Sequence, residues 1–150
     1  MRIAFRLKTP IQSLEVSYLT HSTEDPDKLA SAIEKTLGIN AAPTIEELEG
    51  HFGNRIVHVV YHLTGQAASS AFVELARGMP SSVKREVVRN IGDMLDEHSA
   101  MYLRLDRQSL VRGELALGGT EPLRVRVKPR LFLVKGGAAE FYRGILGGTG

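Results

Sequence analysis

Six residues near the end of the chain alternate strictly between apolar and basic side chains. Residues 123–128 read Leu-Arg-Val-Arg-Val-Lys. A period of two is typical of a β-strand, because successive side chains point to opposite faces of a sheet. The segment therefore predicts a strand whose apolar side chains fill a core while its basic side chains project from the other face.

Further strands are predicted by the same alternation or by composition. Residues 12–20 alternate apolar and polar side chains, and residues 101–106 place a Met and two Leu side chains toward the core. Residues 55–63 are rich in β-branched and aromatic side chains, which favour strands. A Gly-Asn pair at residues 53–54 predicts a turn that joins residues 45–50 to this run as a hairpin.

Helical patterns fill the intervals between these strands. An Asp-Pro start predicts a helix over residues 26–37, which a glycine ends. Apolar side chains at helical spacing predict two more helices, over residues 66–77 and from residue 81 to about residue 98. Residues 108–112 are expected to form a short helical turn. Residues 138–146 have two interpretations, a short docking helix or part of a mobile tail.

The order of these elements, β-α-β-β-α-α-β-β, predicts an α+β fold. We expect an antiparallel or mixed sheet of about five strands with helices packed on one face, which leaves strand faces available to a partner. A length of 150 residues fits a single domain. We place this domain at residues 1–130 and a C-terminal tail at residues 131–150.

Composition excludes several classes of protein. The chain has no cysteine, which rules out a disulfide framework, a thiol nucleophile and a metal site with cysteine ligands. No stretch approaches the ~18 consecutive apolar residues of a transmembrane helix. The N-terminus carries basic residues but lacks the apolar segment of a signal peptide. We therefore expect a cytoplasmic protein.

The charges of the chain are unevenly distributed, although the formal net charge is only +2. Residues 15–50 hold eight acidic residues against two lysines, whereas residues 101–130 hold seven basic residues against three acidic ones. A nucleic-acid-facing surface needs such an asymmetry, because phosphate neutralisation supplies most non-specific affinity. The alternative interpretation is a thermostable surface with segregated ion pairs.

No group of residues has the pattern of a catalytic or metal site. His58 and His62 share a strand face, but four strand residues separate them by about 13 Å, too far to chelate one ion. Acidic residues cluster at residues 46–49 and 93–97, where a charged strand edge and a solvated helix face explain them. The chain has no phosphate-binding glycine loop and no nucleophile elbow. We expect a protein that is not an enzyme and that uses no metal or other cofactor.

Basic side chains carry the stronger functional signal. Arg124, Arg126 and Lys128 share one strand face, and Arg104 on another strand extends it into a positive sheet surface. Tyr102 alternates onto the same face as Arg104, which offers one ring for stacking on an unpaired base. Because only 6% of residues are aromatic, recognition of RNA shape and phosphates is favoured over reading of single-stranded sequence. A second basic group, on the polar face of a predicted helix, comprises Lys84, Arg85 and Arg89.

Four segments together resemble an archaeal family, in the right order across residues 11–128. They are residues 11–27, 49–56, 102–108 and 124–128. The members of that family are described as predicted exosome subunits, or as RNA-binding domains of uncharacterised proteins. The most specific pieces in this chain are the Gly-Asn turn and the run Tyr-Leu-Arg-Leu-Asp from residue 102, and none of them is catalytic.

The resemblance implies a fold related to the ribosomal protein that grips 5S ribosomal RNA, and an association with archaeal RNA processing. Its motifs also carry a structural interpretation, in which Asp106 pairs with Arg104 or Arg107 or caps the helical turn that follows. Carried over by position, the residues that the resemblance assigns to RNA phosphates are Arg104, Arg107, Arg124, Arg126 and Lys128.

Our leading hypothesis is a non-enzymatic RNA-binding module, an accessory to the exosome or to ribosome-linked RNA processing. Its expected partners are structured RNA, held through phosphate contacts, and exosome proteins. The sequence is also compatible with a homodimer. The alternative is a protein-interaction or assembly module that docks a protein or a second copy through its sheet face or tail. Salt dependence separates the two, because only phosphate contacts weaken steeply with salt.

Overall fold

The computed structural model describes residues 11–21, 26–50, 53, 55–130 and 137–148. Every segment that was predicted as a strand forms one, and the fold is α+β as predicted. In chain order the elements are β1 (Ile11–His21), α2 (Pro26–Leu37), β2 (Thr44–Glu49), β3 (Arg55–Thr64), α3 (Gly65–Gly78), α4 (Ser81–Arg89), α5 (Ile91–Met94), β4 (Met101–Leu105), α6 (Arg107–Val111), β5 (Leu123–Pro129) and α7 (Ala138–Gly148).

The five strands form one open sheet in the order β2-β3-β1-β5-β4. Every pair of neighbours is antiparallel, so the sheet is antiparallel rather than mixed. The longest strand, β1, lies at the centre with β3 on one side and β5 on the other. The predicted hairpin of β2 and β3 is confirmed by their pairing, while its predicted turn lies partly outside the described residues.

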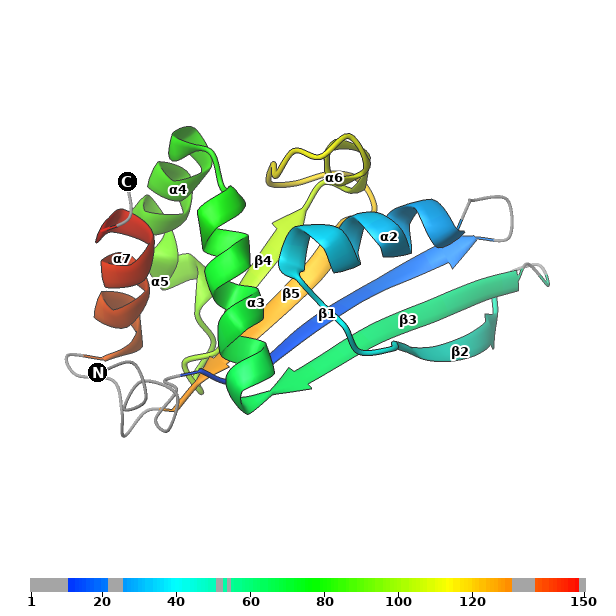
Figure 1. Cartoon of the computed structure of the whole chain (residues 1–150), viewed down its shortest axis with the longest axis horizontal. Helices are drawn as coiled ribbons and strands as arrows, with labels where there is room; N and C mark the ends of the chain where they lie inside the picture. The colour runs from blue at the N-terminus through cyan, green and yellow to red at the C-terminus, as the bar shows by residue number, and fades with distance from the viewer. Residues whose placement is uncertain (1–10, 22–25, 51–52, 54, 131–136, 149–150) are drawn as a thin grey trace.

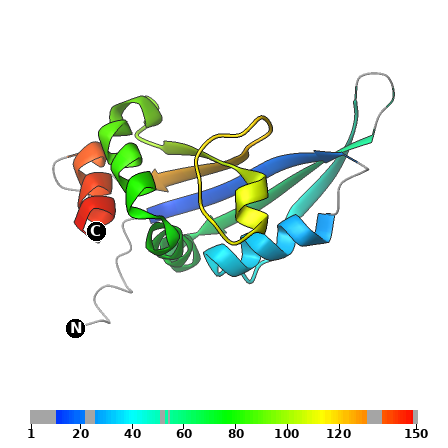
Figure 2. The same ribbon diagram turned by 90° about the horizontal axis from the view of Figure 1, so that it is seen from above.

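Helices cover one face of this sheet. Figure 1 shows α2 and α3 in front of the strands, and the view from above in Figure 2 places both on the same side. At one end of the molecule α4 and α7 lie side by side, and α6 lies beside α2 near the start of β5. None of the described helices is long and apolar enough to cross a membrane.

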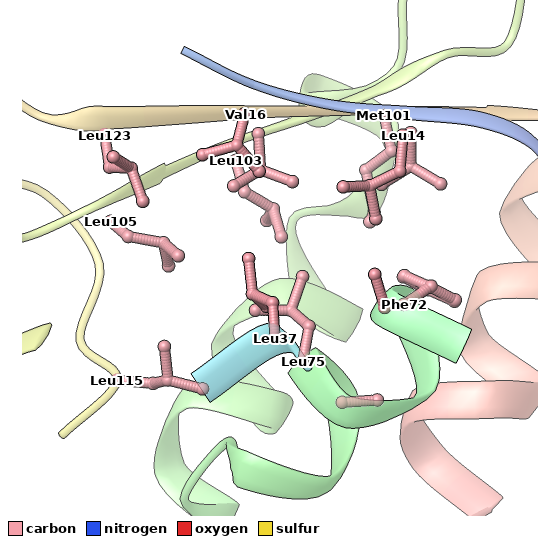
Figure 3. Close-up of a cluster of buried hydrophobic side chains, with 14 of the residues drawn as sticks. Leu14, Val16, Leu37, Phe72, Leu75, Met101, Leu103, Leu105, Leu115 and Leu123 are labelled. Atoms are coloured by element: carbon pink, nitrogen blue, oxygen red, sulfur yellow. The ribbon is translucent and has the colours of Figure 1, made fainter. Parts of the chain in front are cut away.

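The core lies between the sheet and these helices, because the strands bury every second side chain. On β5 the apolar positions are fully buried while the basic positions between them are not. The helical spacing of apolar residues predicted the buried side chains of α3, which are Ala68, Ala71, Phe72, Leu75 and Ala76. Figure 3 shows side chains of the sheet, such as Val16 and Leu103, pointing toward Leu37 of α2 and toward Phe72 and Leu75 of α3.

The helix predicted from residue 81 to about residue 98 is wrong in its length. Helix α4 ends at Arg89, and only the four residues of α5 continue the helical pattern. The chain then reverses, because the Asp96 carboxylate accepts hydrogen bonds from the backbone N–H groups of His98 and Ala100 at 2.8 and 2.9 Å. An Asp side chain that binds nearby backbone groups competes with helix formation. Leu95, apolar and in phase with the helix, forms a β-bridge to Met101 instead.

The C-terminal segment forms a packed helix, the first of its two interpretations. Tyr142 and Leu146 of α7 are fully buried. The Tyr142 hydroxyl donates a hydrogen bond to the Val127 carbonyl at 3.2 Å, and its ring meets Phe72 edge to face with centroids 5.9 Å apart. Burial raises the pKa of Tyr142, so the hydroxyl keeps its proton. Helix α7 therefore ties the end of the chain to β5 and α3.

Candidate nucleic-acid interface

The basic residues of β4 and β5 lie on the sheet face opposite the helices. Alternation dictates this, since the apolar side chains between them are buried in the core. Pairing then sets the basic side chains next to one another: Arg104 lies directly opposite Arg124, and Tyr102 lies opposite Arg126. We call this group of Tyr102, Arg104, Arg124, Arg126 and Lys128 the basic face.

The basic face concentrates positive charge. Side chains on one face are spaced about 7 Å along a strand and about 5 Å between strands, so the four cations fall within one small area. None of the four forms an ion pair with a described residue. Arg104 and Arg124 are directly opposed like charges, which destabilise a sheet. An anion bound between them would relieve that repulsion.

Tyr102 lies on the basic face and is 44% exposed, which confirms that it shares a face with Arg104. Its hydroxyl accepts a hydrogen bond from Arg126 Nε at 2.9 Å, and the Arg126 guanidinium carbon lies 5.8 Å from the ring centre. The two side chains thus hold each other in place. Together they present an aromatic ring and a guanidinium, both of which stack on bases.

The middle of the same sheet face is less positive than the basic face, because a glutamate lies there. Glu15 of β1 lies between Arg126 and His62 in the pairing register, and its carboxylate contacts His62 Nδ1 at 3.2 Å. On β1 the flanking positions Ser13 and Ser17 are small and half-buried. Among the described residues, no three His, Asp or Glu side chains are placed to hold a metal ion.

Arg107 does not lie on the basic face. It is the first residue of α6, only 9% exposed, and its guanidinium donates to the backbone carbonyl of Leu19 and lies 5.5 Å from the centre of the Tyr18 ring. Strand alternation does not extend to it, because β4 ends at Leu105 and Arg107 belongs to α6. The guanidinium instead satisfies a strand carbonyl that β5 does not reach.

Of the three interpretations of Asp106, the cap is the one found. The Asp106 carboxylate accepts hydrogen bonds from the backbone N–H of Ser109 at 3.2 Å and from its hydroxyl at 2.6 Å. The hydrogen bond from the Ser109 hydroxyl is the main reason that the pKa of Asp106 lies below its usual range, and the bond from the backbone N–H adds to it. The cap starts α6 directly after β4 and so sets the position of Arg107.

The second basic group is separated from the first. Helix α4 packs against α7 at one end of the molecule and not on the open sheet face. Arg85 and Arg89 are exposed there, and Lys84 is half-buried. The structure thus brings together four of the eight basic residues that the sequence proposed for RNA, Arg104, Arg124, Arg126 and Lys128, and places the other four elsewhere.

An open sheet face with clustered cations and an exposed aromatic ring is typical of proteins that bind nucleic acid. Comparison of the sequence with known protein families identifies the family to which the chain belongs. The model of the RNA-binding family matches residues 13–129, and the chain belongs to this family. All five strands lie wholly or almost wholly within the match.

Individual relatives are archaeal. The chain is 28% identical over 135 residues to the RNA-binding protein PAB1135 of Pyrococcus abyssi, an alignment that covers 85% of this chain and 88% of the relative. The solved structure of Mth689 from Methanothermobacter thermautotrophicus is similar with a TM-score of 0.72 and 26% identity, over 91% of this chain and 98% of that one. Protein SSO0741 of Sulfolobus solfataricus has the same fold, with a TM-score of 0.76 at 20% identity over 91% and 98% of the two chains.

Proposed function

We propose that this chain is a non-enzymatic RNA-binding module that grips the phosphates of a structured RNA with its basic face. The observation that carries the proposal is the set of four cations, without ion pairs to described residues, on neighbouring strands of the uncovered sheet face. Membership of the RNA-binding family supports the class of ligand.

The composition of the basic face favours contacts to phosphates over reading of many bases. It carries four cations but a single aromatic ring, whereas sheets that read single-stranded RNA stack two or three bases on several rings. Phosphate contacts position a nucleic acid without reading its sequence. We therefore propose that RNA shape determines most of the specificity.

A finer proposal places the module in archaeal RNA processing, as an accessory to the exosome or to ribosome-linked steps. It rests on the family resemblance of the four sequence segments, and not on the geometry of the basic face. Co-purification of exosome or ribosomal proteins with the tagged chain from an archaeal host, in a nuclease-resistant complex, is the expected result. Their absence from such preparations would contradict it.

The test of RNA binding is fluorescence anisotropy with a labelled RNA hairpin across a salt series. The double variant Arg124→Glu/Arg126→Glu should lower affinity by about 100-fold or more, since a charge-assisted hydrogen bond contributes about 1.5–3 kcal/mol. The slope of log affinity against log salt should fall by about two, one for each lost phosphate contact.

The matched control is Arg77→Glu/Arg143→Glu, which makes the same change in net charge on α3 and α7. Both arginines are exposed and pair with a glutamate of their own helix, Glu74 and Glu140. This control should bind RNA within about threefold of wild type, because charges beyond a Debye length are largely screened. Arg85→Glu/Arg89→Glu tests the α4 group separately. Absence of binding at low salt by folded wild-type protein would refute the RNA proposal and favour a protein-interaction module.

A further inference from the structure

A notch interrupts the open sheet face beside the basic face, because β1 extends beyond the start of β5. Ser17 is the last residue of β1 in register with β5, opposite Arg124. From Tyr18 to His21, β1 remains paired with β3 on its other side. On the β5 side the sheet therefore stops, and other parts of the chain close the gap.

Two side chains close the notch. Arg107 reaches in from α6 and donates to the Leu19 carbonyl in place of a strand partner. Glu121, in the loop before β5, contacts His21 at 3.0 Å and ties that loop to β1. Between them remains a hollow of about 180 Å³, lined chiefly by Ser17, His58, Arg107, Thr120, Glu121 and Arg124.

The chemistry of this hollow differs from that of the basic face. Its lining combines two guanidinium groups, those of Arg107 and Arg124, with the carboxylate of Glu121. The rest of the lining is mixed, with hydroxyl groups, one histidine, and the apolar side chains of a leucine and a proline. The hydrogen bond from His21 holds the pKa of Glu121 below its usual range, so this carboxylate is ionised at neutral pH. This carboxylate disfavours a phosphate at its end of the hollow, while the arginines favour an acceptor at the other end. A neutral group with both N–H donors and carbonyl acceptors would satisfy both ends.

The volume of the hollow limits the size of the ligand that it can hold. Pockets for drug-sized ligands hold about 300–1,000 Å³. The hollow is smaller, and its volume of about 180 Å³ suits one planar ring system. Arg124 belongs to both surfaces, so an RNA backbone on the basic face would lie next to the hollow.

We propose that this hollow takes one unpaired base of the bound RNA, with guanine as the best complement. The inference rests on the proposed function and adds a base-specific contact to it. The N–H groups of the guanine edge would donate to the Glu121 carboxylate, while an arginine donates to its O6 or N7, the commonest specific contact of Arg with a base. RNA-binding proteins that recognise sequence usually do so at unstacked bases in loops and bulges.

The experiment compares RNA hairpins that differ at one position only. One is fully paired, four carry a single unpaired nucleotide with each of the four bases, and one carries an abasic site there. The abasic hairpin has the flexibility of a bulge without a base to bind. Wild-type protein should bind the unpaired guanine hairpin roughly tenfold more tightly than the abasic one, since a good base contact contributes about 1–3 kcal/mol.

The variant Ser17→Trp fills the hollow without a change of charge, and Ser13→Trp is its matched control. Both serines are half-buried on the same strand and the same face, but only Ser17 lines the hollow. Ser17→Trp should reduce the ratio of guanine to abasic affinity to about one, while Ser13→Trp retains it. Circular dichroism and thermal melting check that both variants fold, and Glu121→Gln, which keeps the shape of the side chain, should also lower the ratio.

The two proposals fail in different ways. A ratio of one in wild type for all four bases, with tight binding that still depends on Arg124 and Arg126, would overturn the base pocket and leave the basic face standing. Absence of binding to every hairpin would overturn both. A ratio that persists in Ser17→Trp and in Glu121→Gln would place the base elsewhere and refute this pocket.

Discussion

The two edges of the sheet are opposites in both charge and packing. At one edge β4 and β5 carry the basic face, and the side chains between the cations are buried in the core. At the other edge every residue of β2 is exposed, and its side chains include Glu46, Glu47 and Glu49. Arg55 forms an ion pair with Glu47 at 3.0 Å, but the three glutamates outnumber this one arginine, so the hairpin remains acidic overall.

On the proposed function, one edge of the sheet binds RNA and the other is protected against pairing with other chains. Cations on a strand that is packed against a core have a fixed backbone, so the proposed RNA contact would cost only the ordering of their side chains. An exposed edge strand is instead prone to pair with other chains, and charged side chains discourage that. On the proposed function, the acidic edge would also repel RNA and so favour its approach to β4 and β5.

The largest expected effect concerns packing. Leu103→Ala, on β4 beneath the basic face, removes a side chain that is 1% exposed, and it should lower the free energy of unfolding by about 2–5 kcal/mol. Leu48→Ala, on β2, removes one that is 40% exposed and should cost less than about 1 kcal/mol. Urea denaturation with equal m-values measures both. Similar losses in the two variants would mean that the hairpin is packed as tightly as the core strands.

An intermediate effect is expected at the one aromatic ring of the basic face. Tyr102→Leu should weaken binding to an RNA with an unpaired loop by about 5- to 100-fold, because stacking on an aromatic ring contributes about 1–3 kcal/mol per base. Tyr102→Phe retains the ring but removes the acceptor of the Arg126 hydrogen bond. It should stay within about threefold of wild type. Equal losses in both variants would assign the effect to the hydroxyl, which interacts with Arg126 and with Asp96.

Most of the fold could be predicted from the sequence because it rests on local periodicity. Strand alternation located β1, β3, β4 and β5, and helical spacing identified the buried side chains of α3. The end of α4 could not be found in this way, because its apolar phase continues through Leu95. Helix α4 stops at Arg89, where the Asn90 side-chain amide donates to the Glu86 carbonyl at 2.9 Å. The chain reverses further on, where Asp96 accepts from two backbone N–H groups.

The residues of the candidate site also fall into those that local sequence patterns could place and those that they could not. Alternation alone placed Arg124, Arg126 and Lys128 on one face, since this depends on neighbours in the chain. The position of Arg107 depends on where β5 begins relative to β1, which is a matter of register between segments far apart in sequence. The contact of Glu121 with His21 joins residues 100 positions apart, and no local sequence pattern predicts it.

The smallest expected effect tests whether the acidic edge lies outside the RNA footprint. Glu46 points to the open face opposite His58, while Glu47 points to the other face. Glu46→Lys should raise RNA affinity about threefold at ~0.01 M salt, where the Debye length is about 30 Å, and the gain should vanish near 0.15 M. Glu47→Lys changes the charge equally and should give a smaller gain. A gain above about tenfold in Glu46→Lys that persists at ~0.15 M salt would mean that the hairpin contacts RNA directly. The two edges would then form one continuous binding surface, with the acidic residues acting to weaken it.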